Sequence, residues 1–356
     1  MQNHDLYTLL VRFKDSQASG PRDKIYALLG VSSNVSTIDA LRPDYEKSEV
    51  EVIQHTMAFL LDLPGGASCF PDWMLPRSLQ NLERLGIEVL LWAAGHGILT
   101  TVEALLPGKS ESNIRDHDGQ TPLLLAIENG HMDVVDLLLA TDKVGINVQN
   151  SKSQTPLLLA IENGHRHVAR LLLETNEVDI NIQNSERQIP LLIAVARGYD
   201  DIVQPLLMKS QANINFQTLS GQTSLLLAVE RGSAGVAKLL LRESMIDINL
   251  QDSARQTPLL QAITQRDQVM TEMLLEEFDI DINLSNSVGH TPFLLAAQTG
   301  QTTTVHRLLD TGAADDAVED LLGWTPLWLA AINGCDAIVQ MLLDYHFARS
   351  DKPNSS

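Results

Sequence analysis

The feature that most constrains the fold is a motif that returns every 34 residues. The segment from Thr121 to His131 recurs almost unchanged from Thr155 to His165. The same register then continues without insertion at Ile189-Pro190, Thr223-Ser224, Thr257-Pro258, Thr291-Pro292 and Thr325-Pro326. A fixed period of this length is typical of repeat arrays, in which each unit is one supersecondary element that buries its apolar face against its neighbours. The sequence therefore predicts a stack of similar units.

The sequence of each unit predicts a pair of helices. Thr followed by Pro starts a helix, because the hydroxyl can accept a hydrogen bond from a free amide and Pro lacks only an N–H that has no partner there. A Leu-rich run follows, and a glycine ends it at Gly130, Gly164, Gly198, Gly232, Gly300 and Gly334. A second amphipathic stretch comes next, as in residues 134–139, and Asp or Asn then marks a turn. The pattern predicts helices throughout.

This pattern resembles the ankyrin repeat, whose signature is a Thr-Pro-Leu helix start, a Gly-His after the first helix and a closing Ala-Asp-Val-Asn-like turn. Seven units match between residue 116 and about residue 347, and a degenerate eighth unit without Thr-Pro precedes them at Leu91–Leu106. The resemblance implies an all-α ankyrin-repeat solenoid of stacked helix-turn-helix units with a short helical N-terminal extension. We expect a helical N-terminal region, a degenerate capping repeat, seven ankyrin repeats and a disordered tail at 1–84, 85–117, 118–350 and 351–356.

Several units depart from the pattern. Ile189 replaces the capping Thr, Arg266 replaces the terminating Gly and is expected to take a positive φ, and Pro205 is expected to kink a second helix. The third and fifth repeats should therefore be the least stable. The second helix of the last repeat is as apolar as the internal ones. Either Phe347 folds back to cover this end, or the end pairs with another protein.

The N-terminal region carries a second resemblance. The blocks Gly20–Gly30 and Pro43–Val50 resemble the closing part of the fungal heterokaryon-incompatibility (HET) domain, a family that often joins this module to ankyrin repeats. The earlier blocks of that domain are absent. The resemblance implies a fungal protein with an ancestor in non-self recognition. Two interpretations remain open for this region: a relic or short structural cap, and a residual effector.

Composition excludes several classes of protein. The formal net charge is −20, which disfavours long-range attraction to nucleic acid or anionic lipid. Only Cys69 and Cys335 are present, so a disulfide framework and a four-cysteine zinc site are excluded and a reducing compartment is indicated. No apolar run approaches the length of a membrane span, and residues 1–5 lack the order of a signal peptide. We expect a protein of the cytoplasm or the nucleus, whose acidic surface either confers solubility or contacts a basic partner.

No motif supports an enzyme. Residues 107–110 lack the earlier glycine of a phosphate loop, and the turn at residues 116–119 lacks the remaining calcium ligands. His165 and His167 have no Cys or carboxylate cluster beside them, so a structural role is favoured over a metal site. The sequence predicts no catalytic residue, no cofactor, no metal and no small-molecule substrate.

The predicted function is a non-catalytic scaffold that binds a partner protein through the concave side, formed by the turn tips and the first helices. Gln recurs before five helix starts, which suggests a hydrogen-bonding ladder, and Trp324 is the best single anchor. The alternatives are a transcription co-regulator or accessory protein of a fungal secondary-metabolite gene cluster, and an incompatibility effector. In the turns the candidate residues are Gln120, Lys152, Gln154, Glu186, Gln188, Gln222, Arg255, Gln256, His290 and Trp324. On the first helices they are Glu128, Asn129, Glu162, Asn163, Arg197, Glu230, Arg231, Gln265, Gln298 and Asn333.

Overall fold

Threonine caps begin the first helix of most repeats. In the computed structural model, each capping Thr takes an extended backbone conformation, and its side-chain oxygen accepts the N–H three residues on at 3.1 to 3.4 Å. The six caps are Thr121, Thr155, Thr223, Thr257, Thr291 and Thr325. Ile189 occupies the same position and forms no side-chain cap, as predicted.

The structure describes residues 82–106, 113–141, 144–209, 211–313 and 317–350. Within these ranges every regular element is a helix, and helices are joined by turns and loops. The chain divides into two compact units at Val178/Asp179. The described helices of the first unit are α4 (Leu82–His96), α5 (Leu99–Leu105), α6 (Pro122–Glu128), α7 (Met132–Leu139), α8 (Pro156–Glu162) and α9 (Arg166–Glu174). Those of the second unit are α10 (Pro190–Arg197), α11 (Asp200–Leu207), α12 (Ser224–Glu230), α13 (Ala234–Leu241), α14 (Pro258–Gln265), α15 (Gln268–Leu275), α16 (Pro292–Thr299), α17 (Thr302–Asp310), α18 (Pro326–Ile332) and α19 (Asp336–Ser350).

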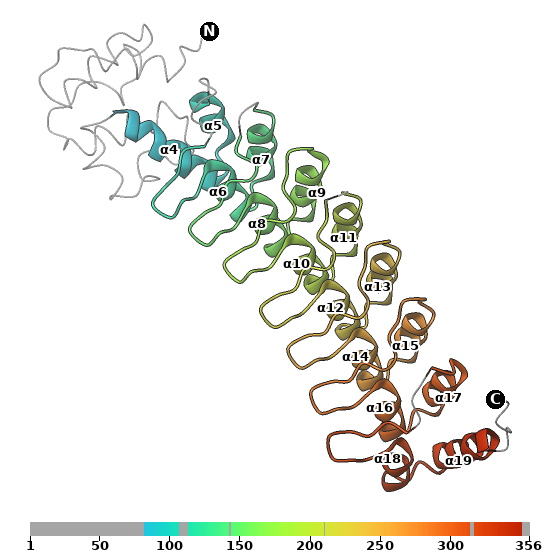
Figure 1. Cartoon of the computed structure of the whole chain (residues 1–356). Coiled ribbons are helices and arrows are strands. Elements are labelled where there is room, and N and C mark those ends of the chain that lie inside the picture. The colour runs from blue at the N-terminus through green and yellow to red at the C-terminus, as the bar shows by residue number, and fades with distance from the viewer. Residues whose placement is uncertain (1–81, 107–112, 142–143, 210, 314–316, 351–356) are drawn as a thin grey trace, which may run out of the picture. The chain divides into compact units, whose positions relative to one another are not determined.

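Within each unit the helices form two rows (Figure 1). In the second unit α10, α12, α14, α16 and α18 pack in that order as the first-helix row, and α11, α13, α15, α17 and α19 pack as the second. In the first unit α4, α6 and α8 form the first-helix row, and α5 packs against α7. The alanine at a single register is fully buried in every repeat: Ala126, Ala160, Ala194, Ala228, Ala262, Ala296 and Ala330. This small side chain allows the first helices to approach closely, and the leucines around it form the core.

An asparagine ladder joins neighbouring repeats on the loops that follow the second helices. Each asparagine donates its Nδ2 hydrogen to a backbone carbonyl 30 residues on, at 2.7 to 3.1 Å. In three repeats its Oδ1 also accepts the backbone N–H 32 residues on, at 2.8 to 3.0 Å. The ladder consists of Asn147, Asn181, Asn215, Asn249 and Asn283. These are the Asn residues of the recurring Ile-Asn pairs, so each pair contributes a buried Ile and a link between repeats.

Two of the positions that depart from the repeat pattern, Arg266 and Pro205, lie at the end of one helix and inside another. Arg266 takes the left-handed conformation at the end of α14, with φ of 58°, as predicted. Pro205 lies inside α11, which continues past it to Leu207.

The last repeat leaves its outer side exposed. Trp328 and Ile332 on α18 are 64 % and 59 % exposed, and Phe347 on α19 is itself 67 % exposed. The alternative in which Phe347 folds back to cover this end is therefore wrong. Residues 1–81 of the expected helical N-terminal region, with the HET-like blocks, lie outside the described residues, as do residues 107–110 and the tail at 351–356.

Replacing Arg266 by glycine should raise the free energy of unfolding by about 1 kcal/mol, because a side chain in the left-handed region costs about 1–2 kcal/mol and glycine avoids that cost. Arg231 is the matched control, since it ends α12 with an ordinary φ of −86°. Arg231→Gly should bring no gain. Urea unfolding followed by circular dichroism measures both, and equal effects of the two changes would contradict the assignment of strain to Arg266.

Candidate functional site

In six repeats the turn before the first helix is organised by one polar side chain. Its oxygen accepts the backbone N–H groups two and four residues on, so the residue just before the Thr cap is held in a defined place. In the last repeat, Asp320 Oδ1 accepts from Leu322 and Trp324 at 2.8 and 2.9 Å. The same role belongs to Asp116, Asn150, Asn184, Asp252 and Asn286 in earlier repeats.

Within a repeat, the turn and the end of the first helix share one surface, and in three repeats a side chain bridges them. Gln120 Nε2 donates to Glu128 Oε2 at 2.8 Å, and Gln222 donates to Glu230 at 2.7 Å. Gln154 donates to Glu162 in the same way. We call this surface the turn face and define it as the turn tips together with the C-terminal ends of the first helices.

The glutamines do not form the predicted ladder from repeat to repeat. Their bonds to glutamates run within a repeat, and Gln154 and Gln188 accept from the turn asparagine of their own repeat. One weaker bond, from Asn150 Nδ2 to Gln120 Oε1 at 3.4 Å, connects two repeats. Other side chains link the repeats: those of the asparagine ladder, and glutamines at other registers, such as Gln217, which donates to the carbonyl of Gln251 at 3.0 Å.

All predicted site residues lie on the turn face, and none is buried. Exposed ones are Glu128, Asn129, Lys152, Asn163, Glu186, Arg197, Glu230, Arg231, Arg255, Gln265, Trp324 and Asn333. Half-buried ones are Gln120, Gln154, Glu162, Gln188, Gln222, Gln256, His290 and Gln298. That they bind a partner stays a prediction.

Sequence reasoning missed an aromatic side chain of α18 that is more exposed than Trp324. Trp324 is 38 % exposed, whereas Trp328 is 64 % exposed. Trp328 stands at the register of Leu294, which is fully buried in the repeat before it, so periodicity predicted a core residue. The signal that could have identified it is the position of α18 at the end of the described array, where no further helix covers it. Arg187 and Arg266 were also missed as exposed residues of the turn face.

The buried carboxylate of Asp320 has a shifted pKa. Burial raises the pKa of this carboxyl. The N–H groups of Trp324 and Leu322 and the His290 side chain lower the pKa by more than burial raises it, so it lies below the usual 3.8. His290 Nε2 lies 3.4 Å from Asp320 Oδ2. The charged form of Asp320 therefore stabilises the last turn.

The change Asp320→Asn should lower the free energy of unfolding by about 1 kcal/mol at neutral pH, because hydrogen bonds to a charged group are stronger than those to a neutral one. A pKa that is lowered in the folded state contributes stability above pH 3.8, and this contribution disappears as the pH falls through the folded pKa. The difference between wild type and variant should thus shrink in acid. Urea midpoints across the acidic range measure it. Asn286, which makes the same two bonds, shows that asparagine fits the turn. A difference that grows in acid would contradict this assignment.

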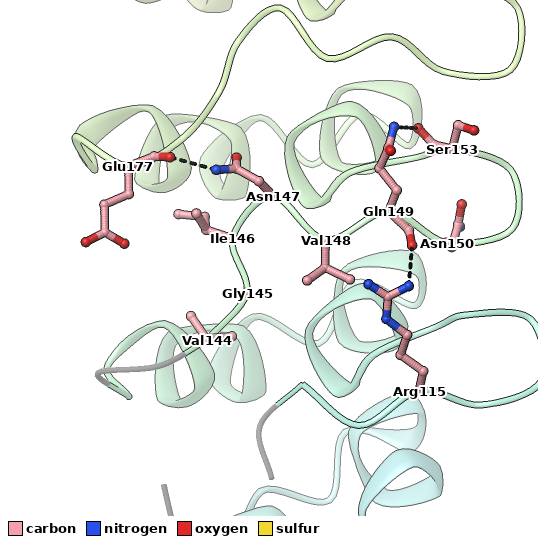
Figure 2. A pocket seen from close by; sticks show the side chains of 10 residues that line it. All are labelled: Arg115, Val144, Gly145, Ile146, Asn147, Val148, Gln149, Asn150, Ser153 and Glu177. Atoms are coloured by element: carbon pink, nitrogen blue, oxygen red, sulfur yellow. Dashed lines mark hydrogen bonds between the residues drawn. The ribbon is translucent and has the colours of Figure 1, made fainter. Parts of the chain in front are cut away.

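A pocket of about 720 Å³ lies in the first unit (Figure 2). Arg115 donates to the carbonyl of Gln149 at 3.4 Å, Gln149 donates to that of Ser153 at 3.0 Å, and Asn147 donates to that of Glu177 at 2.8 Å. These hydrogen bonds connect neighbouring loops, and the pocket is the space between the connected loops.

Within the described part of the chain no three His, Cys, Asp or Glu side chains cluster as metal ligands. No helix described there has the length and apolar character needed to cross a bilayer.

Comparisons with known proteins agree with this architecture. The chain is 45 % identical over 62 residues to Ankyrin repeat domain-containing protein 49 of Bos taurus and 44 % identical over 62 residues to its Homo sapiens counterpart. Each match covers 17 % of this chain and 26 % of the relative, so the chain spans about a quarter of the length of these curated relatives. The crystal structure of the ankyrin repeat domain of Bcl-3, "a unique member of the IkappaB protein family", matches with a TM-score of 0.52 and 24 % identity. That match covers 62 % of this chain and 99 % of the Bcl-3 chain, and it shows the fold.

The family assignment rests on a match that covers most of the chain. A family model for ankyrin repeats (3 copies) matches residues 90–184, 191–286 and 270–354. Ankyrin repeats are typically non-enzymatic units that bind proteins. With the capped helix pairs and the fixed 34-residue register, this match shows that the chain belongs to the ankyrin repeat family.

Proposed function

We propose that this chain is a non-catalytic scaffold that binds a partner protein through its turn face. The observation that carries the proposal is a contrast between two registers of the same helix. The alanine register is fully buried in every repeat. Three residues later the side chain changes from repeat to repeat: Asn129, Asn163, Arg197, Arg231, Gln265, Thr299 and Asn333. A constant core that presents variable polar side chains at a fixed spacing suits recognition of another macromolecule.

The partner of the first unit is proposed to be basic. On the turn face of this unit, Glu128 and Glu162 stand at the ends of α6 and α8. Each accepts a hydrogen bond from a glutamine, which orients the carboxylate. The chain's net charge of −20 supports electrostatic attraction to a basic surface.

Site-specific photo-crosslinking tests the proposed function. A photoreactive amino acid placed at Asn163 or Gln265, on the turn face, should capture a discrete partner from the native cell. The matched positions are Asp136 and Lys238, which are exposed on second helices, and these should capture nothing in common with the first pair. Equal capture from both sets of positions would contradict the proposal.

An incompatibility effector remains a second candidate, favoured by the HET-like blocks Gly20–Gly30 and Pro43–Val50. Induction of residues 1–90 in a fungal host, with and without the repeats, should arrest growth if this region is an effector. Harmless expression of both forms would eliminate it.

The third candidate is a nuclear co-regulator or an accessory protein of a fungal secondary-metabolite gene cluster, and it follows from the family resemblance. A fluorescent fusion distinguishes the nuclear form of the proposal from a cytoplasmic scaffold. Accumulation in nuclei would support it, and exclusion from nuclei would count against it.

A further inference from the structure

The turn face of the second unit carries arginines although the chain as a whole is acidic. All five are exposed, and we call them the arginine row: Arg187, Arg197, Arg231, Arg255 and Arg266. At the matching helix ends of the first unit stand Asn129 and Asn163, beside Glu128 and Glu162. The two units therefore offer different charges at the same register.

Three members of the row stand at the ends of successive first helices. Arg197 is the last residue of α10, Arg231 follows α12, and Arg266 follows α14. These helices pack against one another in that order. Gln265 Nε2 donates to the carbonyl of Glu230 at 2.8 Å, which brings two of the helix ends together. Helices in contact lie about 8–10 Å apart, so consecutive guanidinium groups can follow one line at about that spacing.

The other two members lie at turn tips. Arg187 and Arg255 both have φ of 57°, at a register where Gly221, Gly289 and Gly323 stand in neighbouring repeats. A side chain in this conformation costs about 1–2 kcal/mol relative to glycine. Stability alone would favour glycine at both positions. Ser153 has φ of 59° at the same register of the first unit, so the turn imposes this conformation whichever residue stands there, and it holds both arginines at the tips of their turns.

The guanidinium groups of the arginine row have no partners within the described chain. Backbone groups of these residues are hydrogen-bonded, as in the bond from Gln251 Nε2 to the carbonyl of Arg255 at 2.8 Å, but none of the five side chains forms a hydrogen bond or ion pair with another described residue. Three of the neighbouring acids are engaged by other groups: Glu230 accepts from Gln222 at 2.7 Å, Asp252 accepts two backbone N–H groups of its own turn at 2.8 Å, and Asp267 caps α15. The positive charges are therefore available to an external ligand.

We propose that the arginine row binds an extended acidic peptide segment of a partner protein. This inference rests on the proposed function and specifies the partner chemistry of the second unit. A guanidinium group pairs with a carboxylate through two parallel hydrogen bonds. An extended chain advances about 3.3 Å per residue, so carboxylates about three residues apart match the spacing between helix ends.

A peptide fits better than nucleic acid. The net charge of −20 opposes a long polyanion, whose charge extends far beyond the row. A short acidic segment is repelled less by this net charge, because charges more than about 8 Å away are largely screened at physiological ionic strength.

Fluorescence anisotropy with the full chain tests the proposal. The probe is a labelled peptide of about 12 residues with Glu at every third position in a Gly-Ser background, an extended length that covers the row. Matched peptides carry Gln or Lys instead. The Glu peptide should bind about tenfold more tightly than the Gln peptide, and this advantage should shrink as salt is raised. The double change Arg197→Gln with Arg231→Gln should remove most of it.

The control variant makes the same charge change on the other surface of the same unit. Lys238→Gln with Arg242→Gln alters two exposed residues of α13 and its cap and should leave the affinity within about twofold of wild type. Circular dichroism verifies that both variants are folded. Equal weakening by both variants, or no preference for the Glu peptide over the Gln and Lys peptides, would overturn the proposal. Tighter binding of a single-stranded oligonucleotide that is lost with Arg197 and Arg231 would also overturn it, in favour of nucleic acid. Turn-face crosslinks without any charge preference would leave the scaffold proposal intact and reject this one.

Discussion

The change Leu294→Ala is expected to lower the free energy of unfolding by about 2–5 kcal/mol, the usual cost of deleting a fully buried leucine. Leu294 lies on α16 with no exposed surface. The packing of α16 against both α14 and α18 leaves little freedom for the site to collapse around the cavity. Chemical unfolding followed by circular dichroism measures the loss.

Trp328→Ala is the matched control at the same register, one repeat later. The tryptophan side chain is larger, yet it is 64 % exposed, so its removal should cost less than about 1 kcal/mol. Burial, not size, sets the difference between the two variants. If Trp328→Ala were as costly as Leu294→Ala, the outer side of α18 would have to be covered in solution.

The second large effect is expected at the asparagine ladder. Asn249→Asp replaces the side-chain NH2 group by a carboxylate oxygen and should lower the free energy of unfolding by about 1–3 kcal/mol. The native side chain donates to the carbonyl of Asp279 at 2.7 Å and accepts the N–H of Asp281 at 2.8 Å. Aspartate keeps the second bond but places an oxygen against the carbonyl, and it adds negative charge beside two aspartates.

Asn176→Asp provides the control for this change. Asn176 is exposed in a loop of the first unit and forms no ladder bond, so the same chemical change should cost less than about 0.5 kcal/mol. A thermal or urea scan of both variants is sufficient. Equal losses would show that added charge, not the broken link between repeats, accounts for the effect.

The helices of the array were predictable because their determinants are local. A threonine hydroxyl caps an amide three residues away, and Arg266 takes a positive φ because the helix ends there whether or not glycine is present. The glutamine ladder was wrong for a related reason. A repeated residue type shows that a role recurs, but not whether its partner lies in the same repeat, as Glu230 does for Gln222, or in the next one.

The sequence alone was enough to establish the 34-residue period, the paired helices, the buried alanine register and the exposed register beside it. These properties depend on bonds within a repeat and on a spacing that puts the same residue on the same side of every helix. Three properties required the tertiary structure: the exposure of Trp328, the engagement of the acids around the arginine row, and the link that each ladder asparagine makes to the following loop. Each depends on whether a neighbouring repeat is present and which atoms it presents, and periodicity carries no information on either.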